Sequence, residues 1–137
     1  MINENYVWKS MPDIYICEGI YKNAFVKFEN LMTFNEKWKA SGWELIFSTI
    51  SFNPDIVNYL ISKSDKAAPF TLYIHTTIIN TNSEKEDVYY RYNNCKILEY
   101  IESGVDMKEQ DPNIFHFTFT ANAGRVIIRA EDMPVVE

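Results

Sequence analysis

The sequence predicts a mainly β protein, an antiparallel β-sandwich or small barrel with one inserted α-helix at about residues 54–65. Three observations carry this prediction. Several short segments alternate apolar and polar residues with the period of two that a half-buried strand requires. A single segment carries a clear helix start. No linker, repeat or shift in composition divides residues 1–137, so we expect a single β-barrel domain.

The first predicted strands form a pair at residues 14–17 and 24–28, because both segments are rich in β-branched and aromatic residues. Residues 1–12 mix apolar and polar side chains without a regular period, and we expect them to form an N-terminal arm over the body. The next segment, residues 34–42, is polar and carries lysines. Residues 43–50 alternate again and predict a strand.

The helix is predicted from its start, Asn53-Pro54-Asp55. Asn at the N-cap accepts a hydrogen bond from a free backbone N–H, Pro in the first turn has no N–H to leave unpaired, and Asp lies near the positive end of the helix dipole. Apolar residues then recur at helical spacing. Four of them are expected to face inward: Ile56, Val57, Leu60 and Ile61.

Five further strands are predicted at residues 70–78, 88–92, 95–101, 114–121 and 125–129. Asn93-Asn94 indicates a turn or bulge between two of them, since Asn tolerates a positive φ. Residues 102–113 are a polar, acidic loop. Asn122-Ala123-Gly124 is expected to join the last two strands as a hairpin.

Composition and motifs exclude several classes of function. Thirteen Lys and Arg against 19 Asp and Glu give a net charge of −6, which has the wrong sign for a nucleic-acid binder. Apolar runs such as Leu45–Phe47 are far shorter than the roughly 20 residues that span a bilayer. No phosphate-cradling, dinucleotide, zincin or nucleophile-elbow motif occurs. Met1–Tyr6 has no basic region followed by an apolar run, so residence in the cytoplasm is expected.

The chemically versatile residues predict no enzyme, cofactor or metal site. Cys17 and Cys95 lie in apolar, alternating stretches, and no C-x-x-C motif or Cys/His cluster accompanies them. We interpret them as small buried hydrophobes rather than a disulfide or redox pair. His75 and His116 lie on predicted strands. We interpret them as residues that pair across strands or lie on a partly exposed face, rather than as metal ligands or general bases. Most acidic residues between Glu99 and Asp111 belong to a solvated loop, which would not hold paired carboxylates at a fixed separation.

Two aromatic clusters have two readings each. Phe115, Phe117 and Phe119 share one strand face, which is either the packed interior or the lining of a ligand cavity, and the packed interior is favoured. Tyrosines at positions 89, 90 and 92 place rings on both faces of a strand. A ring on the outer face suits a subunit interface, and the ordinary strand propensity of tyrosine explains the cluster equally well.

From Phe28 onward the order of elements resembles a known family. The segments that carry the likeness are Gly42–Phe47, Asn53–Leu60, Phe70–Ile74, Tyr90–Asp106 and Asp111–Ala123. In pattern they are similar to the tube proteins of contractile injection machines, in particular the Hcp family of type VI secretion in its Bacteroidetes-type (TssD) form. The resemblance covers roughly three-quarters of the chain. In such tube proteins an extended loop lies on the neighbouring subunit or ring, whereas here the corresponding stretch, residues 34–41, is short.

The resemblance implies a non-enzymatic structural subunit that assembles in the cytoplasm. Family members form closed hexameric rings that stack into an inner tube, carry effectors in the lumen and are exported as part of the injected tube. Sheath, spike and effector proteins are the implied partners. A phage tail tube is a close alternative, and a monomeric small-molecule-binding β-barrel is the alternative from another class. The cargo, the ring size and the strand faces that line the lumen stay open.

A ring subunit must cover its strand edges with neighbouring copies, because open edges expose unpaired backbone N–H and C=O groups. The candidate edges are residues 14–17, 88–92 and 125–129, which contain few charges or prolines. The residues predicted for the subunit interface are Ile14, Ile16, Tyr89, Tyr90, Tyr92, Arg125 and Arg129.

Overall fold

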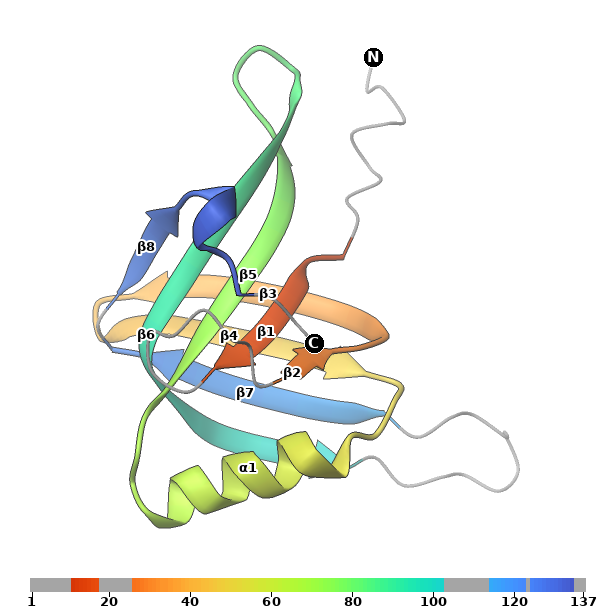
Figure 1. Ribbon diagram of the computed structural model, residues 1–137, viewed down its shortest axis with the longest axis vertical. Helices are drawn as coiled ribbons and strands as arrows, with labels where there is room; N and C mark the ends of the chain where they lie inside the picture. The colour runs from red at the N-terminus through yellow and green to blue at the C-terminus, as the bar shows by residue number, and fades with distance from the viewer. Residues whose placement is uncertain (1–10, 18–25, 103–113, 123, 135–137) are drawn as a thin grey trace.

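A computed structural model describes residues 11–17, 26–102, 114–122 and 124–134. Most of the predicted N-terminal arm and the predicted acidic loop lie outside these ranges. The described chain forms, in order, β1 (Asp13–Cys17), β2 (Val26–Phe28), β3 (Leu31–Lys39), β4 (Gly42–Thr49), α1 (Pro54–Asp65), β5 (Phe70–Ile79), β6 (Lys85–Glu102), β7 (Phe115–Ala121) and β8 (Arg125–Ile128) (Figure 1). A short 3-10 helix at Ala130–Asp132 follows β8.

All the strands belong to one antiparallel sheet in the order β2-β1-β5-β6-β7-β4-β3, with β8 paired to β6. The sheet folds over on itself, so that β3, β4 and β7 run across the direction of β1, β5 and β6 (Figure 1). The long strand β6 connects the two layers, because its first half pairs with β5 and its second half with β7. The prediction of an antiparallel β-sandwich or barrel with one helix is therefore confirmed.

A bulge lets β6 pass from one layer to the other. The register with β5 shifts between the pairs Leu72↔Tyr92 and Phe70↔Cys95, and Asn94 adopts a φ of 51°. The predicted bulge at Asn93-Asn94 is confirmed, although the two strands predicted on either side of it are one continuous strand. A bulge bends and twists a strand locally without ending it, so β6 changes direction and continues as one strand.

The helix begins and ends at the predicted residues. The Asn53 side chain accepts hydrogen bonds from the backbone N–H groups of Asp55 and Ile56, at 3.0 and 3.3 Å. Of the residues predicted to face inward, Ile56, Val57 and Leu60 are buried, whereas Ile61 is 51% exposed. The prediction for Ile61 is wrong because each helical residue turns by about 100°, which carries position 61 off the stripe centred on positions 56 and 60.

The interior between the layers is packed with aromatic rings. Phe28 contacts Phe47 and Phe117 edge to face, with ring centroids 4.9 and 5.2 Å apart. Phe115, Phe117 and Phe119 are buried, as the packed-interior reading predicts. Cys17 and Cys95 are both buried, and burial raises the pKa of the Cys95 thiol to about 12. Both cysteines are therefore the small buried hydrophobes that the sequence predicts.

Two predictions about strand pairing are wrong. Residues 34–39 belong to β3, which pairs with β4 through a tight turn, and do not form a loop. Polar residues and lysines suit this strand because it lies at the edge of the sheet. Strand β8 pairs with β6 and does not form the predicted hairpin with β7. The physical reason is that β7 already pairs with β4 on one side and β6 on the other, so it has no free edge.

Candidate assembly surface

Three strands of the described chain pair with a single neighbour and so keep an open edge: β2, β3 and β8. The prediction that residues 125–129 contain an edge strand is confirmed. The predictions for residues 14–17 and 88–92 are wrong, because β1 lies between β2 and β5, and residues 89–92 of β6 lie between β5 and β8. Edge position depends on which strands pair, and the alternation within a strand does not report it.

Four of the predicted interface residues lie in the core of the subunit. Ile14, Ile16 and Tyr92 are fully buried within one chain, and Tyr90 is 9% exposed. Because their own chain covers them, these side chains have no surface to offer a second subunit. A charge placed at Tyr90 would test folding rather than assembly. The predicted interface residues that keep exposed surface are Tyr89, Arg125 and Arg129.

Arg125 is the centre of a cluster that holds β8 to the barrel. Its guanidinium carbon lies 4.1 Å from the ring centre of Trp43 and 4.0 Å from that of Tyr90. Its Nη1 atom is 3.3 Å from Oε1 of Glu36, and the Tyr92 hydroxyl donates a hydrogen bond to the other oxygen of that carboxylate. The cluster therefore joins β3, β4, β6 and β8 at one rim of the barrel.

The charges in this cluster are partly shielded from water. The side chains of Arg125 and Glu36 are each 23% exposed. Burial, together with the hydrogen bond to Glu36, raises the pKa of Tyr92 far above its ordinary range, so the hydroxyl remains a donor. Sequence reasoning missed Glu36 and Trp43 as members of this cluster. No local signal could have found them, because they lie far from Arg125 in sequence.

Exposed apolar side chains lie along the two longer open edges. On β8, Ile127 is 72% exposed and Val126 is 39% exposed, and on β3 Trp38 is 65% exposed. A hollow of about 310 Å³ lies between β8 and the start of β6, with Tyr89 and Ile127 in its lining. Open backbone edges combined with exposed apolar side chains mark this rim as a candidate contact between proteins.

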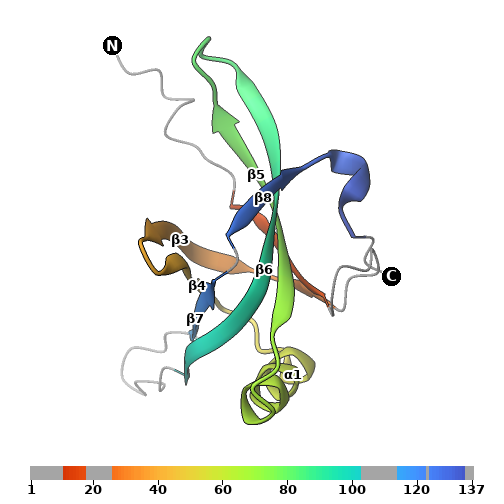
Figure 2. The same cartoon turned by 90° about the vertical axis from the view of Figure 1, so that its left-hand side faces the viewer.

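The hairpin of β5 and β6 projects beyond the barrel as a two-stranded arm (Figure 2). The arm consists of the pairs from Thr76↔Val88 to Ile79↔Lys85. In the described chain β1 pairs with β5 only as far as His75, and β8 pairs with β6 only as far as Tyr89. Among the described residues the arm thus has no third strand on either side.

His75 connects the base of the arm to the barrel. Its Nδ1 atom is 3.2 Å from a carboxylate oxygen of Asp13 on β1, and its Nε2 atom is 3.1 Å from one of Asp87 on β6. The ring stacks on Tyr89 at a centroid distance of 4.5 Å. Hydrogen bonds from His75 and then Thr77 lower the pKa of Asp87. His75 thus has the cross-strand pairing that the sequence favours for it.

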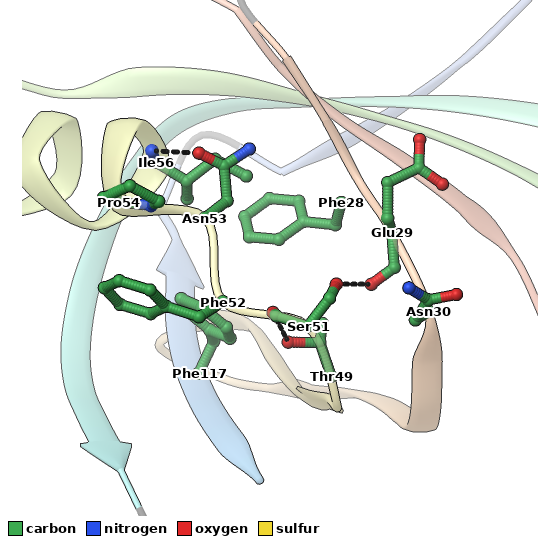
Figure 3. Close-up of a pocket in the computed structure, with 10 residues that line it drawn as sticks. All are labelled: Phe28, Glu29, Asn30, Thr49, Ser51, Phe52, Asn53, Pro54, Ile56 and Phe117. Carbon is green, nitrogen blue, oxygen red and sulfur yellow. Dashed lines mark hydrogen bonds between the residues drawn. The ribbon is translucent and has the colours of Figure 1, made fainter. Parts of the chain in front are cut away.

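A surface hollow of about 340 Å³ lies beside the start of α1 (Figure 3). Its lining includes Phe28 of β2, Phe52 before the helix and Phe117 of β7. The Ser51 hydroxyl donates a hydrogen bond to the backbone oxygen of Glu29, which ties the two chain segments beside the hollow together. The aromatic core fills the space between the layers, so this hollow lies at the margin of the core and is not a central ligand cavity.

Two further observations concern the described ranges only. No three side chains among the His, Cys, Asp and Glu residues there gather in a group that could hold a metal ion. No helix there has the length and apolar character needed to cross a membrane.

Solved structures with the same fold include Hcp proteins and a chain of a prophage baseplate. A crystal structure of an Hcp protein covers 80% of this chain and 86% of its own, with a TM-score of 0.53 and 10% identity. Hcp1 from Flavobacterium johnsoniae covers 87% of this chain and 100% of its own, with a TM-score of 0.52 and 9% identity. A chain in the six-fold symmetrised cryo-EM structure of the anti-feeding prophage baseplate covers 85% and 90%, with a TM-score of 0.51 and 8% identity.

In sequence, no protein-family model and no curated protein matches this chain. At these identities the likeness concerns the fold alone, and the chain has an Hcp-like fold. The family resemblance stated from the sequence is confirmed at this level.

Proposed function

We propose that this protein is a non-enzymatic structural subunit of a type VI or related contractile injection tube. The observation that carries the proposal is the Hcp-like fold, which extends over 80% or more of the chain in each of the three structures. A tube subunit needs no catalytic group and acts through the contacts between its copies. The open strand edges and their exposed apolar side chains are consistent with that requirement.

In this proposal the subunits form a closed ring of six members. The six-fold symmetry of the anti-feeding prophage baseplate supports the number. A ring requires two different surface patches on each subunit that fit one another. The open edge of β8, with Ile127, Arg125, Arg129 and the neighbouring Tyr89, is the proposed first patch. Pairing along this edge would satisfy backbone groups and cover Ile127.

The wider biological role is part of the same proposal. Rings assemble in the cytoplasm, stack into an inner tube and leave the cell as part of the injected structure. The proposed partners are sheath, spike and effector proteins, with effectors held in the lumen. Neither nucleic acid nor a membrane is a proposed partner.

The proposal is tested by the mass of the assembled protein. Light scattering after size-exclusion chromatography, with negative-stain electron microscopy, is expected to show six-membered rings for the wild type. Ile127→Lys places a charge on the open edge of β8 and is expected to give monomers with an unchanged thermal unfolding curve. The matched control is Ile61→Lys, a similar change at an exposed isoleucine of the helix, which is expected to keep the ring.

A wild-type protein that stays monomeric at high concentration would contradict the tube function. Intact rings of Ile127→Lys would contradict the assignment of the β8 edge and move the contact to β2 or β3.

A further inference from the structure

The two-stranded arm has the properties of a segment that contacts another molecule. A hairpin of two strands is marginally stable by itself in water. In the arm the side chains of Ile78 and Ile79 remain partly exposed, and the exposed acidic residues Glu84 and Glu86 lie at its outer end. Neither glutamate forms an ion pair within the described residues. The exposed Lys85 lies between the two glutamates, so the end of the arm presents a net negative charge together with apolar surface.

A hollow with the opposite charge lies beside the end of α1. Its volume is about 180 Å³, and its apolar lining includes Phe70 and Ile97. Lys63 and Lys96 also line it, and Lys66 caps the helix next to it. Lys66 and Lys96 are exposed and form no ion pair in the described part of the chain. The hollow thus combines an apolar floor with positive charge at its rim.

The arm and this hollow cannot meet within one molecule. The arm projects from one end of the long axis, and α1 lies at the opposite end, in both views of the molecule (Figures 1 and 2). A contact between opposite ends must therefore join two copies. Such a contact is heterologous, and when repeated along one direction it produces a stack without limit.

We propose that the β5–β6 arm of one subunit docks in the basic hollow beside the α1 end of a second copy, so that copies join head to tail. Glu84 and Glu86 would face Lys66 and Lys96 of the second copy, and the apolar side chains of the arm would cover Phe70 and Ile97. The inference rests on the proposed tube function in that it assigns the contact between stacked rings. It uses a different surface from the β8 edge proposed for closure of each ring.

Charge reversal on either side tests the contact. The double variants Glu84→Lys/Glu86→Lys and Lys66→Glu/Lys96→Glu are expected to raise the concentration needed for stacking by about tenfold or more. Combining all four substitutions restores the opposite charges and is expected to restore stacking. Glu29→Lys/Glu99→Lys, which changes the net charge as much as the first variant at exposed positions elsewhere, is the control and is expected to stack normally.

The measurement is the length distribution of stacks by negative-stain electron microscopy at several protein and salt concentrations. Stacks of the wild type are expected to shorten as salt rises, because salt screens exposed charges. A second measurement mixes Asn82→Cys protein with Ser64→Cys protein under oxidising conditions. A disulfide-linked pair that contains one copy of each variant is expected, since these positions lie at the arm's end and in the hollow.

The outcomes separate this inference from the proposed function. Either of two results would overturn the docking of the arm and leave the proposed ring intact. One is that rings of a charge-reversed double variant stack as well as wild-type rings. The other is that the variant with all four substitutions does not recover stacking. Wild-type rings that do not stack would overturn the docking as well. Head-to-tail stacks of single subunits with no ring would contradict the ring and support the arm contact. A monomer at all concentrations would contradict both.

Discussion

The barrel body and the β5–β6 arm are parts of the same two long strands, yet they are held in different ways. In the body, residues 71–75 of β5 pair with β1 and β6, and an aromatic core packs against them. In the arm, the same strands pair only with each other among the described residues. At its base, His75 and Thr77 contact Asp87, and Val88 packs against the core. Burial stabilises the body, whereas the arm depends on a few cross-strand contacts.

The difference indicates where burial within one chain contributes to stability. The body packs a cluster of buried side chains from both layers of the sheet. The described side chains of the arm are partly or fully exposed, so the proposed contact with a second copy would add burial that the arm lacks in one chain. Substitutions in the body should therefore change unfolding, and substitutions in the arm should change assembly.

The largest expected effect is that of Phe119→Ala in the body. The Phe119 side chain is fully buried and contacts Phe28, Phe47 and Phe70. Its loss is expected to cost about 3–5 kcal/mol through lost burial and the cavity left behind. In the arm, Ile78→Ala is expected to cost less than about 1 kcal/mol, since this side chain lies outside the core. Urea unfolding of both variants measures the contrast, and equal losses would contradict it.

The next effect compares neighbouring residues of α1. Leu60 is 1% exposed, and Leu60→Ala is expected to cost about 2–5 kcal/mol of unfolding free energy. Ile61 is 51% exposed, and Ile61→Ala is expected to change stability by no more than about 0.5 kcal/mol. Chemical denaturation followed by tryptophan fluorescence gives both values. A loss below about 1 kcal/mol for Leu60→Ala would show that the helix contributes little to the core.

A smaller effect is expected at the rim of the barrel where Arg125 holds β8. Arg125→Ala leaves Glu36 and the Tyr92 hydroxyl without their cation, and we expect a loss of about 1–3 kcal/mol. Arg129→Ala is the control, because that side chain is 76% exposed and its removal is expected to cost no more than about 0.5 kcal/mol. Hydrogen exchange at the backbone N–H groups of β8 is expected to accelerate in the first variant alone. Unchanged exchange would show that backbone pairing with β6 suffices to hold the strand.

The smallest effect concerns acid and the base of the arm. The pKa of Asp87 is lowered in the folded protein, chiefly by its hydrogen bond with His75. A lowered pKa means that the stabilising contribution is complete above the unfolded value of about 3.9 and is lost as the pH falls through the lower folded value. Arm backbone N–H groups are therefore expected to exchange more readily below about pH 4 than at pH 6, after correction for intrinsic rates.

Asp87→Asn is the control for this acid effect. It removes the titrating group while it keeps a side-chain oxygen that can accept a hydrogen bond. The acid-dependent opening of the arm is expected to disappear in this variant. An equally strong acid effect in Asp87→Asn would show that Asp87 is not the group responsible.

Features with a local cause could be predicted from the sequence. The helix bounds follow from Asn53-Pro54-Asp55 at one end and the polar residues at the other, because capping involves groups within a few residues. The inner face of β7 follows from the alternation of Phe115, Phe117 and Phe119. The bulge follows from the tolerance of Asn94 for a positive φ. Each of these patterns is complete within a short segment.

Features that depend on pairing could not be predicted in the same way. Alternation shows that residues 14–17 and 88–92 are strands and which of their faces is apolar. It does not show whether either edge of the strand pairs with another strand. Whether an edge is open depends on which distant segments pair with it, and here β2 and β8 cover the edges expected to be free. The Arg125 cluster likewise brings together β3, β4 and β6, so its members share no spacing in the chain.

The sequence by itself therefore determined the helix, most of the strands, most of the core faces and the likeness to tube proteins, since these follow from local periodicity and from the order of elements along the chain. The tertiary structure alone decided which edges are open, which tyrosines are buried, and that the arm and the basic hollow lie at opposite ends. The physical reason is that side-chain burial and backbone pairing at the surface are properties of segments that meet only after the chain has folded.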